Sequence, residues 1–263
     1  MKRISQVFFP LMLVLFIVVL WNTQGTTASD LLMKKQGKPI AVLELFTSEG
    51  CSSCPPADRM VSRLLSRARR KGLPIYPLSF HVDYWDKLGW KDPYSQKRFT
   101  TRQSHYMKAF GAKRVYTPQV VVNGRMHFVG NHQQKIESAV SKELKVPSKS
   151  TISLDIKHKK SQKTLTIRYN IKHKNIFPTQ PIHLHIALVE RGLVSSVKRG
   201  ENAQRTLFHN NVVRVFKTIR VGKHLSGSTS IKIPNSVVLE NSSIIAYLQH
   251  PKTMRILGAT SHS

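Results

Sequence analysis

The chain contains two cysteines, Cys51 and Cys54, separated by two serines. Such a pair can be a redox-active dithiol, a small structural disulfide or part of a metal site. A disulfide closing so short a ring contributes about 2 kcal/mol at most to stability. A structural zinc site needs four ligands, and there is no second Cys pair to supply them. A redox pair needs only a strand, a turn and a helix whose N-terminus favours the thiolate. We favour the redox pair, with Cys51 and Cys54 as catalytic residues and with no bound cofactor and no resident metal.

The segments beside the cysteines predict that strand, turn and helix. Residues 39–46 form an apolar run typical of a buried strand, in which Glu44 is the single charge. Glu44 is a candidate proton relay, because a carboxylate behind a dithiol can accept the proton of the buried thiol; a strand-end or outward-facing Glu is the alternative. A helix is predicted from about Cys54, with apolar residues at three- and four-residue spacing, and it ends at Gly72.

The next residues continue the alternation of strands and helices. We expect strands over 75–82 and 120–122, a return strand over 125–129 after the turn Asn123-Gly124, and helices over 95–110 and 132–144. The order is β-α-β-α-β-β-α, with the Cys pair in the first strand-to-helix turn and Pro118 before the third strand. That is the ordering of the thioredoxin fold, so an α/β thioredoxin-like N-terminal domain is expected over residues 38–146.

A dense aromatic and acidic segment lies between residues 81 and 94. Trp85 within it could form a wall beside the cysteines that grips a substrate chain. Alternatively, the segment is simply a loop pinned by its own tryptophans.

The pattern changes after a short linker that contains Pro147. Short alternating runs predict about seven strands, and an all-β sandwich-like C-terminal domain is expected over residues 150–263. These runs are 152–156, 165–169, 182–189, 212–219, 229–233, 244–249 and 256–259. His183 and His185 share a strand face and are interpreted as polar-face side chains in preference to metal ligands. Residues 199–202 are interpreted as an ordered turn that closes the domain interface, in preference to a segment reaching back to the cysteines.

The N-terminus has the pattern of an export signal. Lys2 and Arg3 precede an apolar run over residues 7–21, and small residues follow up to Ala28. We expect a signal peptide over residues 1–28 and a periplasmic or secreted protein. An uncleaved membrane anchor is the alternative, although the apolar run is shorter than a spanning helix needs.

The chain is strongly basic, with 42 Lys and Arg against 13 Asp and Glu. The basic residues are spread evenly, 21 over residues 31–148 and 19 over residues 149–263. This distribution is typical of a basic solvated surface that can meet an anionic envelope, and it shows no clustered patch or motif that would indicate a specific nucleic acid.

Several motifs resemble the exported thioredoxin-like proteins grouped as domain-of-unknown-function family 1223. The resemblance spans most of the mature chain. It is carried by residues 44–58, 81–86, 89–93, 116–119, 199–202 and 211–214. It implies an exported two-domain protein. The thioredoxin fold further implies that Cys51 is the attacking thiol, Cys54 the resolving thiol, and Pro118 a cis-proline that lines the substrate site. Thr117 and Trp85 are further candidate substrate-binding residues. The usual aromatic residue before the first cysteine is Gly50 here.

These features favour an exported thiol-disulfide oxidoreductase or redox carrier. Its partners would be protein thiols or disulfides and a dedicated redox partner. Two alternatives stay open. One is a carrier of copper or another soft metal, using the Cys pair and a histidine such as His81. The other is a non-catalytic envelope-binding module with an inert disulfide.

Overall fold

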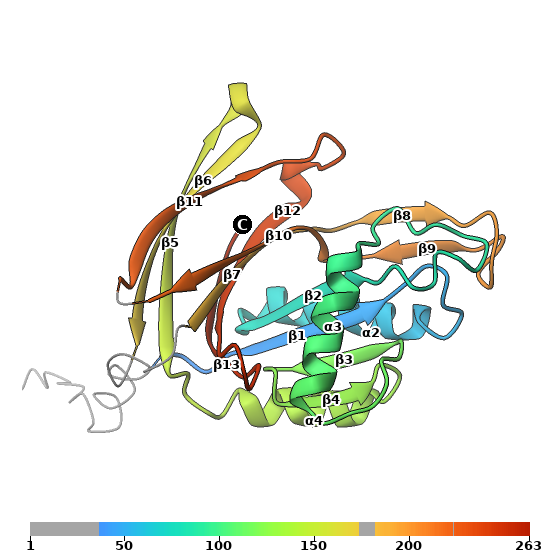
Figure 1. Ribbon diagram of the computed structural model, residues 1–263, viewed down its shortest axis with the longest axis horizontal. Helices are drawn as coiled ribbons and strands as arrows, with labels where there is room; N and C mark the ends of the chain where they lie inside the picture. The colour runs from blue at the N-terminus through green and yellow to red at the C-terminus, as the bar shows by residue number, and fades with distance from the viewer. Residues whose placement is uncertain (1–36, 174–181, 223) are drawn as a thin grey trace, which may run out of the picture.

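The computed structural model describes residues 37–173, 182–222 and 224–263 (Figure 1). Its first half contains the predicted alternation of strands and helices. The elements are β1 (Ala41–Thr47), α2 (Pro55–Lys71), β2 (Ile75–His81), α3 (Lys97–Ala109), β3 (Gln119–Val122), β4 (Met126–Val129) and α4 (Gln133–Glu143). The predicted export signal and its cleavage site lie outside the described residues. In the part of the chain that the structure describes, no helix is long and apolar enough to span a bilayer.

The second half is built from strands, as predicted. They are β5 (Ser150–Lys159), β6 (Thr164–His173), β7 (Ile182–Glu190), β8 (Leu193–Ser196), β9 (Thr206–His209), β10 (Val212–Val221), β11 (Ser226–Lys232), β12 (Ser242–Gln249) and β13 (Ile256–His262). The pair β8 and β9 was missed by the sequence reasoning, because each strand is four residues long and carries no extended apolar run.

Local sequence accounts for the boundaries of α2. Two prolines occupy its first positions, where a missing backbone N–H costs no intrahelical hydrogen bond. Gly72 ends the helix in the left-handed conformation, with φ of 60°. The turn Asn123-Gly124 between β3 and β4 has positive φ at both residues, as a tight hairpin turn requires.

The predicted fold class, an α/β thioredoxin-like domain followed by a separate all-β sandwich, is wrong. Among the described residues, strands outnumber helices, and the first four strands do not form a sheet of their own. They make up half of one mixed eight-stranded sheet, in the order β13-β12-β7-β10-β2-β1-β3-β4. The sequence divides where its pattern changes, but the backbone hydrogen bonds continue across that division.

The seam of this sheet lies between β2 and β10. The backbone N–H of Ser79 donates to the backbone carbonyl of Asn211 at 2.9 Å. The side-chain amide of Asn211 donates in turn to the backbone carbonyl of Pro77 at 2.9 Å. Proline has no N–H for a ladder, and β2 tolerates Pro77 because β10 pairs with β2 at a single register position, Val212 opposite Ser79.

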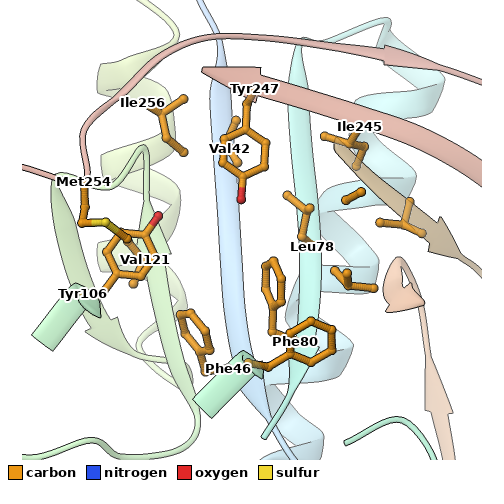
Figure 2. Close-up of a cluster of buried hydrophobic side chains, with 14 of the residues drawn as sticks. Val42, Phe46, Leu78, Phe80, Tyr106, Val121, Ile245, Tyr247, Met254 and Ile256 are labelled. Carbon is orange, nitrogen blue, oxygen red and sulfur yellow. The ribbon is translucent and has the colours of Figure 1, made fainter. Parts of the chain in front are cut away.

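Three groups of buried side chains hold the layers together. Helix α3 covers one face of the sheet, and Figure 2 shows Tyr247 and Ile245 of β12 packed among Val42, Leu78 and Phe80. On the opposite face, α2 and α4 cover β1 and β3, and the three-stranded sheet β11-β6-β5 covers β7 and β12. The core on the α3 side therefore joins both halves of the chain.

Candidate functional site

Cys51 and Cys54 form a disulfide in the turn between β1 and α2. Their Cα atoms lie 5.4 Å apart, and Cys54 is the residue from which α2 begins. Both cysteines are fully buried, whereas Ser52 and Ser53 between them are exposed. The predicted catalytic pair is thus oxidised and covered, with the two serines between the cysteines at the surface.

The three predicted substrate-binding residues lie together beside this turn. The indole N–H of Trp85 donates to the Thr117 hydroxyl at 2.8 Å, and the Thr117–Pro118 peptide bond is cis. A Cβ at Gly50 would lie 3.1 Å from the Cβ of Trp85, so the loop that follows β2 packs closely against the residue before the first cysteine.

Pro118 is buried close to the start of α2. A Cβ built on Gly130 would lie 2.9 Å from the Cβ of Pro118 and 2.7 Å from the Cβ of Ala57. Gly130 thus allows the proline to approach the first turn of the helix that Cys54 begins.

The segment between β8 and β9 closes over the cysteine turn. The Asn202 amide donates to the carbonyls of Glu49, at 2.8 Å, and Cys51, at 2.9 Å. The Glu201 carboxylate accepts a hydrogen bond from the N–H of Ser52 at 3.0 Å. We expected residues 199–202 to be an ordered turn in preference to a segment reaching back to the cysteines; residues 201–204 form a turn, and this turn also reaches the cysteines. In Figure 1 the β8–β9 hairpin extends beside the loop that follows β2.

A buried group of charges lies beneath the cysteine turn and was missed by the sequence reasoning. The Nε2 atom of His209 lies 3.2 Å from Glu49 Oε1, and its Nδ1 lies 3.9 Å from Asp58 Oδ1. All three side chains are at most 7% exposed. Burial alone would lower the pKa of His209, but the neighbouring carboxylates of Asp58 and Glu49 outweigh burial and raise that pKa to about 10. The imidazolium therefore offsets part of the charge of two carboxylates.

His209 comes from β9 and Glu49 lies in the segment before the first cysteine, so the sequence places these charges far apart. The one available signal was Asp58, a charged residue four positions after Cys54. Residues at that spacing share a helix face.

A second buried pair supports the same turn. His81 Nδ1 lies 2.7 Å from Asp92 Oδ2, and the same carboxylate oxygen accepts a hydrogen bond from the N–H of Glu49 at 2.8 Å. Burial would raise the pKa of Asp92, but the charge and hydrogen bonds of its neighbours outweigh burial and lower it. His81, the histidine of the soft-metal alternative, is thus bound to Asp92. No group of three or more His, Cys, Asp or Glu residues among those described is arranged to hold a metal ion.

Glu44 lies on the other side of the sheet. It shares the strand face of Val42 and Phe46, which pack with α3, whereas Leu43 and Leu45 face α2. The structure does not bring this candidate proton relay to the cysteine turn.

The Glu44 carboxylate is instead enclosed by polar groups from both halves of the chain. It accepts hydrogen bonds from Arg102 at 2.5 and 2.7 Å, from the Tyr106 hydroxyl at 2.7 Å and from the Tyr247 hydroxyl at 3.0 Å. Burial would lower the pKa of Arg102, but the negative charge of Glu44 outweighs the effect of burial and holds that pKa well above its usual range.

Fold and site together define a disulfide-bearing protein whose two halves share one mixed sheet. The chain belongs to the family described as "Protein of unknown function (DUF1223)", whose model matches residues 42–249. No curated protein matches the chain.

Solved structures share this architecture. A protein from Agrobacterium tumefaciens is 28% identical and aligns with a TM-score of 0.60, covering 84% of this chain and 92% of its own. HBP35 of Porphyromonas gingivalis is 14% identical and aligns with a TM-score of 0.62, covering 86% of this chain and 76% of its own. The second likeness concerns the fold alone.

Proposed function

We propose that the protein exchanges thiols and disulfides with protein partners outside the cytoplasm. The observation that carries the proposal is the Cys51–Cys54 disulfide at the start of α2, with Trp85 and Pro118 close to the same turn. A helix N-terminus favours the thiolate that disulfide exchange needs, and cysteines spaced in this way can pass between a disulfide and a dithiol.

The exchange proceeds through a mixed disulfide. A partner thiolate attacks the Cys51 sulfur, the Cys51–Cys54 bond breaks, and Cys54 leaves as a thiolate that takes up one proton. A second partner thiolate attacks the partner sulfur of the mixed disulfide and releases Cys51. The partner loses two electrons and two protons, and the Cys pair gains them. The reverse sequence reduces a partner disulfide.

The proton for Cys54 comes from the side of α2 that carries Asp58. Cys54 and Asp58 are four residues apart, both are buried, and they therefore share the inner face of the helix. Asp58 also accepts a hydrogen bond from the Thr47 hydroxyl at 3.0 Å and pairs with His209. In this proposal Asp58 takes the relay role that the sequence reasoning gave to Glu44.

The β8–β9 hairpin supplies the docking surface for the partner chain. Val194 and Phe208 are directly opposite each other in this hairpin and are 55% and 63% exposed. The segment joining the same two strands binds the cysteine turn, so a polypeptide held by this apolar pair lies next to the disulfide. Exposed basic residues of the segment, Lys198, Arg199 and Arg205, favour a partner with acidic residues beside an apolar one.

Export is the part of the proposal that rests on the N-terminal sequence. Lys2 and Arg3, the apolar run and the small residues before position 28 support passage into an oxidising compartment. A disulfide persists there unless a partner reduces it.

The first test is the reduction potential of the Cys51–Cys54 pair, measured on the mature chain in glutathione buffers with trapping of free thiols. We expect a value between about −270 and −120 mV, the range of protein thiol exchangers. The Cys54→Ser variant should also retain mixed disulfides with partner proteins, while Cys51→Ser should not. A potential below about −300 mV, together with no trapped partner, would sink the redox assignment.

The burial of both cysteines favours one second candidate, a module that binds an anionic envelope surface and keeps an inert disulfide. For such a module we expect a reduction potential of the Cys51–Cys54 pair below about −300 mV. Retention on vesicles of anionic lipid that is lost at high salt would then support it.

A further inference from the structure

A cleft of about 880 Å³ lies beside α3, on the sheet face that α3 only partly covers. Helix α3 forms one wall, strands β7 and β10 form the other, and the turn between β12 and β13 closes one end. This volume falls within the usual range of small-molecule sites. The cleft faces away from α2, so it is separate from the cysteine turn.

Every ionisable side chain that lines the cleft is basic. These are Arg98, Arg102, His105, Lys108, His183, His185 and Lys252. The residues from α3 recur at three- and four-residue spacing, so the helix presents one cationic stripe to the cleft.

The charge of this stripe is only partly neutralised. Arg102 is paired with Glu44 behind the cleft, but Arg98, Lys108 and Lys252 form no salt bridge with any described residue. The positive field also acts on the two histidines of β7. Burial, Arg220 and Arg102 lower the pKa of His183, and burial, Arg102 and His183 lower that of His185.

An aromatic surface lies among these cations. The ring of Phe216 stacks on His185 with centroids 5.1 Å apart and an interplanar angle of 16°, and Arg102 lies 4.9 Å from the Phe216 centroid. Phe216 is partly exposed and lines the cleft. Nδ1 of His185 lies 2.9 Å from the Thr218 hydroxyl, whereas its Nε2 has no hydrogen-bond partner among the described residues.

We propose that this cleft binds a small organic anion with a planar apolar body, of the class of aromatic carboxylates. The aromatic part packs on Phe216, and the carboxylate is attracted by the cations that line the cleft, Arg98 and Lys108 of α3 and Lys252 of the facing turn. The positive charges of Arg98, Lys108 and Lys252 are not neutralised by a carboxylate of the described residues, so they can attract an anionic ligand. The ring of Phe216 favours an anion with an aromatic body over a simple inorganic ion.

The test is a calorimetric titration of the intact mature protein with 2-naphthoate. The neutral 2-naphthalenemethanol and inorganic phosphate are titrated in parallel. We expect 2-naphthoate to bind at least tenfold more tightly than either comparison compound. Equal binding of the alcohol would show a merely apolar patch, and equal binding of phosphate a merely cationic surface. Either outcome overturns the proposal.

Surface variants locate the binding. The double variant Arg98→Gln/Lys108→Gln should lose about tenfold in affinity for 2-naphthoate, as expected for the loss of two exposed charges. The matched control Arg59→Gln/Lys142→Gln removes two exposed charges from α2 and α4 and should bind as the unaltered chain does. Equal losses in both double variants would overturn the assignment to this cleft. All four side chains are exposed, so neither variant threatens folding.

Discussion

The side-chain amide of Asn202 donates to the backbone carbonyl of Cys51, which precedes it by 151 residues, at 2.9 Å. Through this contact a segment of the second half fixes the turn that carries the disulfide. A second hydrogen bond from the same amide reaches Glu49, so Asn202 holds the residues on both sides of Gly50. The cysteine turn is thus built by both halves of the chain.

Replacing Asn202 should make the disulfide more accessible. We expect Asn202→Ala to raise the rate of disulfide reduction by dithiothreitol about fivefold to thirtyfold, because two hydrogen bonds of about 1 kcal/mol each no longer hold the segment over the turn. The rate is followed by trapping of free thiols. Asn235→Ala removes an exposed asparagine elsewhere and should leave the rate unchanged. A rate in Asn202→Ala equal to that control would show that this segment does not limit access.

Because of His209, the free energy of unfolding should decrease as the pH rises into the alkaline range. Its pKa is raised in the folded protein, so its ion pairing stabilises the fold fully below about pH 6.5, and this contribution is lost as the pH rises through about 10. We expect His209→Gln to lower the free energy of unfolding by about 3 to 5 kcal/mol at pH 6, because Glu49 and Asp58 lose their buried counter-charge. Urea unfolding of both proteins at several pH values measures the difference, which should narrow toward pH 10. A difference that stays constant with pH would contradict the charged state of His209.

Glu44 should affect stability without affecting redox chemistry. We expect Glu44→Gln to lower the free energy of unfolding by about 3 to 5 kcal/mol, since Arg102 would keep a buried charge without its counter-charge. The reduction potential of the Cys pair should stay unchanged, because Glu44 faces α3 and the cysteines lie at the start of α2. Arg168→Gln, which breaks an exposed ion pair with Asp155, is the control and should cost less than about 1 kcal/mol. A shifted potential in Glu44→Gln would restore Glu44 as a proton relay.

The exposed pair Val194 and Phe208 on the β8–β9 hairpin should affect the reaction with protein substrates and not the reaction with small thiols. We expect Phe208→Ser to raise the KM for a reduced or oxidised protein substrate about tenfold, since a largely exposed aromatic anchor is removed. The rate with dithiothreitol should not change, because a small thiol needs no docking surface. Val238→Ser, at another exposed apolar residue, serves as the control. Equal effects on protein and small-molecule substrates would argue against docking at this hairpin.

The sequence by itself determined the local elements and the residues of the cysteine turn. Apolar runs and helical spacing placed β1, α2, β2 and α3 correctly, because these signals arise within a few residues. The Cys pair, Trp85, Thr117 and Pro118 were identified from residue type and resemblance, and the structure brings them together.

Only the tertiary structure decided how the halves join and which charges reach the site. The seam between β2 and β10 depends on one strand register and on the Asn211 amide, and nothing in either strand's own pattern specifies its neighbour. Glu44 and Asp58 are both carboxylates near the cysteines in sequence, but strand alternation turns Glu44 toward α3 and helical spacing turns Asp58 toward Cys54. His209 and Asn202 come from the second half, so only the folded chain could place them beside the disulfide.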